Sequence, residues 1–97
     1  MIQTATPLPA HLLGCHPDHR PQRVETRGTP RSHRALILPC PPLWHVECAR
    51  CGIATVPHPS RAVAEARWRD ADDAHRIPLA QIAHARTLAV AALADAA

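Results

Sequence analysis

The sequence contains no phenylalanine, no tyrosine and no lysine, and it has only two tryptophans among its 97 residues. Alanine supplies much of the 46% hydrophobic content, so few side chains can bury a large apolar area. A chain of this length forms one small domain whose core is only marginally sufficient. We therefore expect an additional source of stability for the fold, which can be a metal ion, disulfides or an oligomer interface.

Two further absences concern the compartment in which the protein acts. No run approaches the roughly 20 apolar residues that a membrane span needs. The start of the chain has neither the basic nor the apolar region of a signal peptide. We therefore expect a protein of the reducing cytoplasm, where its four cysteines indicate a metal site or a redox pair rather than structural disulfides.

The strongest motif is Cys48-Ala-Arg-Cys51-Gly52, which follows an alternating stretch typical of a short strand. Two thiolates at this spacing can bind one ion from a tight turn, and glycine suits a backbone with positive φ after the second ligand. The alternatives are a thioredoxin-like redox pair and a pair of inert buried thiols. Because the redox motif opens a helix, whereas strand residues follow here, the sequence predicts half of a zinc ribbon.

A second cluster, Cys15-His-Pro-Asp-His19, provides the other half of the predicted site. Cys15 and His19 are four residues apart, within the spacing that zinc knuckles use. We choose these two residues as ligands, although His16 and Asp18 compete for the same role. The sequence leaves the fourth ligand open among His16, Asp18 and His19.

The fourth cysteine, Cys40, is placed by a geometric argument. If residues 40–48 are extended at about 3.3 Å per residue, Cys40 lies roughly 26 Å from Cys48. This distance is too long for a shared ion unless the chain bends at the prolines between them. We expect Cys40 to be a free and mostly buried thiol, and we expect His45, which alternates away from Cys48, to lie at the surface.

Four ligands drawn from cysteine and histidine fill a tetrahedral zinc ion and leave no position for a water molecule. Such a site is structural and supplies folding energy rather than catalysis. The sequence has no Ser/His/Asp order, no paired carboxylates and no glycine-rich phosphate loop. We therefore expect a structural Zn²⁺ in a protein that is not an enzyme.

The periodicity predicts an α+β fold, in which a small antiparallel zinc-ribbon-like sheet is followed by one packed helix and a C-terminal alanine-rich helix. The expected strands cover residues 22–26, 34–38, 43–48 and 53–56. Ser60 is expected to cap the packed helix, which docks on the sheet through Trp44, Ala64 and Trp68. We divide the chain into a mobile leader (1–10), a zinc-ribbon-like domain with its docked helix (11–76) and a C-terminal helix (77–97).

The C-terminal helix is expected to begin at Pro78, a position where proline is tolerated. Its apolar positions approximate a narrow seam that Arg86 interrupts. The seam can cover the sheet or pair with another copy of the chain in a homodimer, and both alternatives stay open.

Five arginines gather in the first third of the chain, which carries few acidic residues. They are Arg20, Arg23, Arg27, Arg31 and Arg34. This asymmetry favours contact with a protein partner or with the phosphates of a nucleic acid. The solvated surface of a protein that uses arginine for all of its basic residues is the simpler interpretation, and we prefer it for these five positions. The absence of phenylalanine and tyrosine weakens the nucleic-acid interpretation, because single-strand binders stack bases on aromatic rings.

The pattern Trp44-x-Val46-x-Cys48-x-x-Cys51-Gly52, followed by Ser60, Ala64 and Trp68, resembles the Lar family of restriction-alleviation proteins and related small phage zinc ribbons. The resemblance covers residues 44–68. Family members have Cys-Pro-x-Cys-Gly as their first knuckle and Asn where this chain has Arg69.

The resemblance implies a phage or prophage protein that acts in the cytoplasm of the bacterial host. Its expected partner is a host restriction-modification or other defence protein, whose action it reduces by protein–protein contact. The alternative function is a nucleic-acid-binding zinc ribbon. A cytosolic redox protein is a third and more distant alternative.

Overall fold

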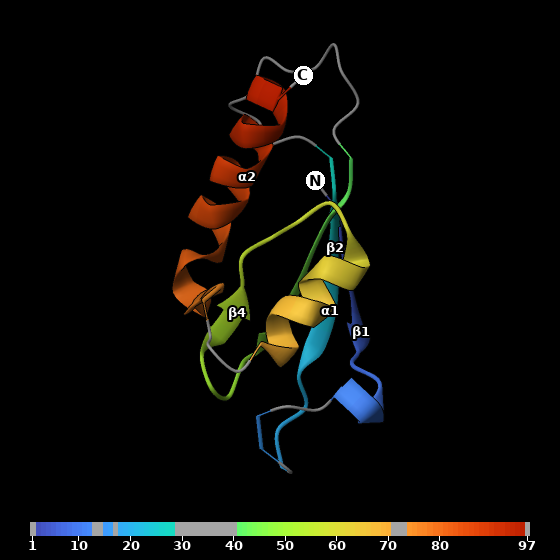
Figure 1. Cartoon of the computed structure of the whole chain (residues 1–97). Helices are drawn as coiled ribbons and strands as arrows, with labels where there is room; N and C mark the ends of the chain where they lie inside the picture. Colours follow the sequence, from blue (N-terminus) through green and yellow to red (C-terminus); the bar gives the residue numbers. More distant parts are fainter. Residues whose placement is uncertain (1, 13–14, 17, 29–40, 71–73, 97) are drawn as a thin grey trace.

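A computed structural model of the chain describes residues 2–12, 15–16, 18–28, 41–70 and 74–96 (Figure 1). Its strands are β1 (Ile2–Pro7), β2 (Gln22–Arg27), β3 (Leu43–Cys48), β4 (Ile53–Thr55) and β5 (Arg76–Pro78). Its α-helices are α1 (Arg61–Arg69) and α2 (Ile82–Ala96). Two short 3-10 segments, η1 (Ala10–Leu12) and η3 (Leu79–Gln81), complete the described elements.

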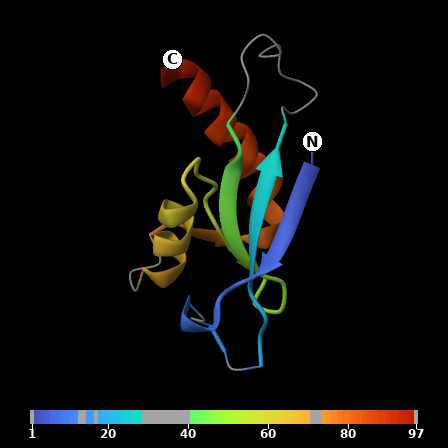
Figure 2. The same cartoon turned by 90° about the vertical axis from the view of Figure 1, so that its right-hand side faces the viewer.

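The strands form one antiparallel sheet in the order β1-β2-β3-β4-β5, so neighbours in the chain are also neighbours in the sheet. Helix α1 lies beside the sheet and α2 passes behind its strands in the view of Figure 2. The expected α+β class, with a small antiparallel sheet and two helices, is therefore confirmed.

The first strand corrects the expectation of a leader over residues 1–10. Residues 2–7 form β1, which pairs with β2 in a continuous register from Ile2 opposite Arg27 to Pro7 opposite Gln22. All six residues of β1 are exposed, so the strand has no apolar alternation that its sequence could reveal. Proline at its end is compatible with an edge strand, where a missing N–H costs no ladder bond.

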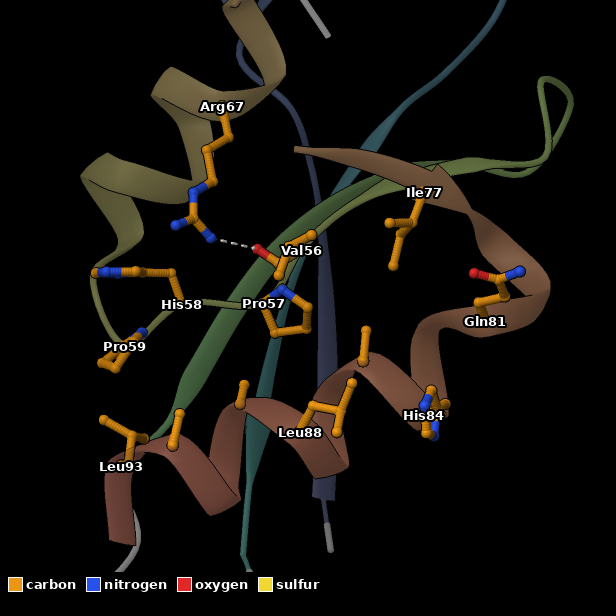
Figure 3. A pocket seen from close by; sticks show the side chains of 13 residues that line it. Val56, Pro57, His58, Pro59, Arg67, Ile77, Gln81, His84, Leu88 and Leu93 are labelled. Atoms are coloured by element: carbon orange, nitrogen blue, oxygen red, sulfur yellow. Dashed lines mark hydrogen bonds between the residues drawn. The ribbon is translucent and has the colours of Figure 1, made fainter. Parts of the chain in front are cut away.

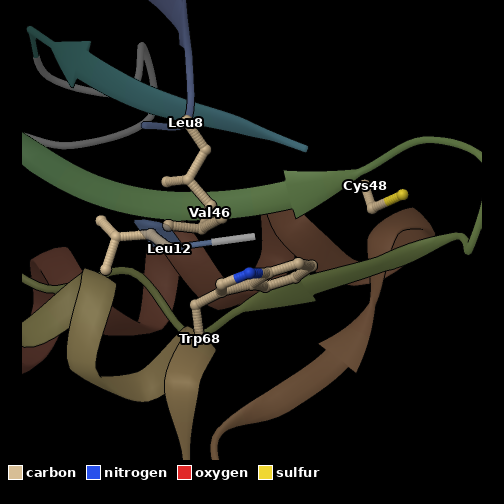
Figure 4. Close-up of a cluster of buried hydrophobic side chains, with 5 residues drawn as sticks. All are labelled: Leu8, Leu12, Val46, Cys48 and Trp68. Atoms are coloured by element: carbon tan, nitrogen blue, oxygen red, sulfur yellow. The ribbon is translucent and has the colours of Figure 1, made fainter. Parts of the chain in front are cut away.

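The segment after β1 also contributes to the core. Leu8 and Leu12 pack with Val46, Cys48 and Trp68 in the main buried cluster (Figure 4). The side chain of Trp68 is only 1% exposed. Residues 2–12 therefore belong to the folded domain, and Leu8 and Leu12 pack around the indole that docks α1.

Helix α1 begins as the sequence predicts, and two of the three expected docking residues, Ala64 and Trp68, are buried. The amide of Val63 donates to the hydroxyl of Ser60 at 3.3 Å, which satisfies one of the free donors at the helix start. Ala64 and Trp68 are the buried residues of the helix and face β3 and β4. Trp44 is half-buried and lies under the guanidinium of Arg23, whose carbon is 5.9 Å from the ring centre.

The opposite face of the sheet shows that the expectation for His45 is wrong. His45 is 1% exposed, and its Nε2 lies 2.8 Å from a carboxylate oxygen of Glu47. Alternation does turn it away from Val46 and Cys48, but this second face is covered. The buried Arg86 of α2 lies close enough to influence the charge of the imidazole. Arg86, which interrupts the expected seam of α2, is therefore buried on the side of the helix that approaches His45.

The boundary expected between residues 76 and 77 falls inside β5. Arg76 pairs with Thr55, and Pro78 pairs with Ile53, so residues 77 and 78 are part of the sheet rather than of the C-terminal helix. The α-helix begins at Ile82, after η3. Among the helices that the structure describes, none has both the length and the apolar character that a membrane crossing requires. The strand expected over residues 34–38, together with Cys40, lies outside the described residues.

Candidate metal centre

The sheet register brings the two cysteine-containing turns together. Gln22 at the start of β2 is opposite Glu47 near the end of β3. In an antiparallel pair, the residues that precede one strand lie beside those that follow the other. The turn that contains Cys15 and His19 therefore meets the turn that contains Cys48 and Cys51, although the two turns are distant in sequence.

The turn after β3 has the geometry that its glycine predicts. The amide of Gly52 donates to the carbonyl of Cys48 at 2.9 Å, and Gly52 has a φ of 67°. This left-handed conformation is readily available to glycine. The carbonyl of Gly52 accepts from the amide of Leu79 at 2.8 Å, which connects the turn to η3. Cys48 is consequently buried at the strand end, while Cys51 is exposed on the turn.

Four side chains form a cluster whose ligand atoms all lie within 4.8 Å of one another. The cluster consists of Cys15, His19, Cys48 and Cys51. The Nδ1 atom of His19 lies 3.1 Å from Sγ of Cys51 and 3.5 Å from Sγ of Cys48. The structure thus brings together the four residues that the two motifs predicted as ligands.

The structure also shows which of the three candidates for the fourth ligand, His16, Asp18 and His19, belongs to the cluster. The Nδ1 atom of His16 accepts the amide of Asp18 at 3.5 Å, and both residues are exposed. The ring of His16 lies against that of His19, with 4.9 Å between ring centres. Only His19 belongs to the described cluster of ligand atoms.

Arg50 was not singled out by the sequence, and it joins the two turns. Its guanidinium donates to the backbone carbonyl of Asp18 at 3.3 Å. Because Arg50 is a single arginine between two cysteines and belongs to no sequence pattern, this role could not be predicted from the sequence. The bond holds the knuckle of His19 against that of Cys48 independently of any ion.

The pKa values of the three thiols are shifted in different directions. Burial raises the pKa of Cys48, but hydrogen bonds from the amides and thiols around it lower this pKa by more. The net change is a decrease. Burial, and then the neighbouring Cys48 sulfur, raise the pKa of Cys15. Desolvation, and then Cys48, raise the pKa of Cys51 to about 11. The first negative charge is therefore favoured on Cys48, and it disfavours ionisation of the other two thiols.

This arrangement fits a tetrahedral metal ion. Zn–S bonds of about 2.3 Å and Zn–N bonds of about 2.0 Å imply separations of roughly 3.5–3.8 Å between ligand atoms. The separation of 3.5 Å between His19 and Cys48 falls in this range, and that of 3.1 Å between His19 and Cys51 is somewhat shorter. A dication would also remove the repulsion among neighbouring thiolates, since thiols bind such an ion in their deprotonated form. The cluster can hold a metal ion, and its Cys₃His composition is one that structural zinc sites use.

The predicted contact arginines are only partly free to meet a partner. Arg20 is exposed, but Arg23 forms an ion pair of 2.7 Å with Glu65 of α1. Arg27 is paired with Glu25, which raises its pKa. Arg31 and Arg34 lie outside the described residues. An anionic partner would therefore have to displace carboxylates from two of these side chains.

Fold and site together define a small α+β protein with a four-residue cluster suited to a metal ion. Comparisons of the chain with protein-family models, with curated proteins and with solved structures find no significant match.

Proposed function

We propose that the protein is a non-catalytic binding module whose fold is completed by a structural Zn²⁺. The observation that carries this proposal is the convergence of three thiols and one imidazole from two turns, within 4.8 Å of one another. Four such ligands satisfy a tetrahedral ion and leave no position for a substrate or an activated water. The ion would then hold the two turns together, and function would reside in the surface that this fold presents.

The partner that we propose is a host restriction-modification or other defence enzyme. The resemblance of residues 44–68 to restriction-alleviation proteins supports this choice. The positions that carry the resemblance include Cys48, Cys51, Ala64 and Trp68, which have structural roles in the site and in the docking of α1. The exposed surface around these positions is available for protein–protein contact in the cytoplasm of a bacterial host.

Direct binding to nucleic acid is the less favoured alternative. Arg23 and Arg27 are already paired with carboxylates, so they would neutralise fewer phosphates than their number suggests. Binding to DNA that weakens steeply with salt would revive this alternative.

A transformation assay tests the proposed function. Unmodified plasmid DNA is introduced into matched bacterial strains with and without an active restriction-modification system, each producing the protein. We expect the protein to raise transformation of the restricting strain toward that of the non-restricting strain. Cys48→Ser should abolish this effect, while His16→Ala, which alters a neighbour outside the cluster, should retain it. Unchanged transformation by folded protein across several restriction types would refute the proposed partner.

A further inference from the structure

A groove separate from the metal centre runs between α2 and the segment that joins β4 to α1 (Figure 3). Its volume is about 760 Å³, within the range of pockets that bind small molecules. The apolar wall from α2 includes Ala85, Leu88 and Leu93, and the facing wall includes Val56 and Ile77. Leu88 is 57% exposed, which is unusual for a large apolar side chain in this protein.

The polar groups of the groove gather at its ends. Arg67 and His58 lie at one end in Figure 3, and Gln81 and His84 lie at the other. No aspartate or glutamate is among the lining residues that the structure describes. The groove therefore combines an apolar middle with polar ends, one of which holds the Arg67 guanidinium, and this suits an elongated molecule that carries a negative charge.

The end formed by His58 and Arg67 offers donors rather than acceptors. The amide of Ser60 donates to Nδ1 of His58 at 2.9 Å, so the neutral ring carries its proton on Nε2. The guanidinium of Arg67 donates to the carbonyl of Val56 at 3.0 Å, which occupies that acceptor. Arg67 forms no ion pair within 4.0 Å with a carboxylate of the described residues.

The charge of Arg67 and the burial of both side chains also disfavour a positively charged ligand at this end of the groove. Burial, and then Arg67, lower the pKa of His58. Burial lowers the pKa of Arg67. A carboxylate placed between them would accept hydrogen bonds from both and compensate the partly desolvated guanidinium. Charge complementarity therefore identifies the head group that this end of the groove would take.

We infer that the groove binds a small amphiphilic acid, whose carboxylate contacts Arg67 and His58 and whose apolar chain lies along Leu88 and the alanines of α2. The inference does not depend on the partner proposed above, because none of these residues belongs to the metal cluster. A second copy of the chain seated on Leu88 is the main rival occupant, and the experiment separates the two.

The test uses the full zinc-loaded chain, labelled with ¹⁵N, and two ten-carbon probes below their micelle-forming concentrations. Sodium decanoate carries a carboxylate, and decyltrimethylammonium carries a positive head group on the same chain. We expect decanoate to give saturable amide shifts at Val56, His58 and residues 84–93, since residues 57 and 59 are prolines without an amide proton. The cationic probe should bind about tenfold more weakly or worse, because it loses charge-assisted hydrogen bonds.

Variants locate the head group and the chain. Arg67→Gln should weaken decanoate binding about tenfold, and Leu88→Asp should remove it by placing a charge in the apolar wall. Arg61→Gln is the matched control, since Arg61 is exposed on the same helix and does not line the groove. Equal binding of both probes, or shifts confined to other residues, would overturn the inference. So would groove signals that depend on protein concentration and do not respond to decanoate.

Discussion

Cys48 connects the core to the metal centre. Its side chain is 1% exposed and packs with Val46 and Trp68, while its sulfur lies 3.5 Å from Nδ1 of His19. A change at this residue therefore alters both packing and metal affinity. Cys51 is exposed on the turn, so its replacement should act mainly on the metal.

Gly52 gives a prediction about backbone strain. A Cβ at this position would meet no atom within 4 Å, so the cost of Gly52→Ala comes from its positive φ alone. We expect a loss of about 1 kcal/mol in the free energy of unfolding. Gly52→Asn should cost less, because asparagine adopts the left-handed region more readily. Chemical denaturation of the three proteins measures the order, and an alanine variant as stable as the parent would show that this φ carries no strain.

His45 gives a prediction about pH. Burial lowers its pKa, the Glu47 carboxylate raises it, and Arg86 lowers it, with a net decrease. Because the folded-state pKa lies below the ordinary value of about 6.5, the unfolded chain takes up the proton first. The stability from neutral His45 is thus fully present above about pH 6.5 and declines as the pH falls below it.

The variant His45→Gln tests this expectation because glutamine does not titrate in this range. The difference in unfolding free energy between parent and variant should shift in favour of the variant by up to about 1.4 kcal/mol per pH unit below pH 6.5. Protonation of the metal ligands affects both proteins and cancels in the difference. Parallel stability curves between pH 7 and pH 5 would mean that His45 takes up its proton equally in both states.

The N-cap of α1 gives a prediction at the scale of an element. Ser60→Ala removes the hydroxyl that accepts from Val63 and should cost about 1 kcal/mol. Ser60→Asp should restore most of this loss, since a carboxylate both caps the helix and suits the positive end of its dipole. Thermal unfolding compares the three proteins. Equal losses for Ala and Asp would indicate that the loss does not come from the missing cap.

Elements with strong local signals were predictable from the sequence. The alternation from Leu43 to Cys48, the cap at Ser60 and the stripe that includes Trp68 each specify their structure through nearby residues. Strand β1 was not predictable in this way, because all its residues are exposed and residues 8–21 separate it from its partner β2. The helix α2 was predicted, but the burial of its Arg86 near His45 depends on tertiary packing.

The metal cluster illustrates the same distinction. The spacing of Cys48 and Cys51 indicates one knuckle directly, because both ligands lie on a single turn. The choice of His19 over His16 depends on the conformation of the other turn, where an amide of Asp18 occupies Nδ1 of His16. The sequence could therefore predict three members of the cluster, while the choice of its fourth member required three-dimensional geometry.

For the molecule as a whole, metal binding and folding should be coupled. The cluster joins the turn before β2 to the turn after β3, and the core around Trp68 is small. Removal of zinc with a chelator should lower the free energy of unfolding by more than about 3 kcal/mol, because an ion bound only by the folded state stabilises that state. Denaturation with and without chelator measures the change. Cys48→Ser, already without metal, should not respond to the chelator.

The most direct measurement is the zinc content of the purified protein by elemental analysis, on the parent and on matched variants. We expect about one ion per chain, as a four-ligand site requires. The ion should be lost in Cys15→Ser, Cys48→Ser and His19→Ala, and kept in His16→Ala, whose ring lies beside that of His19 without joining the cluster. Absence of zinc from the parent, or equal loss in the two histidine variants, would contradict the assignment of this centre.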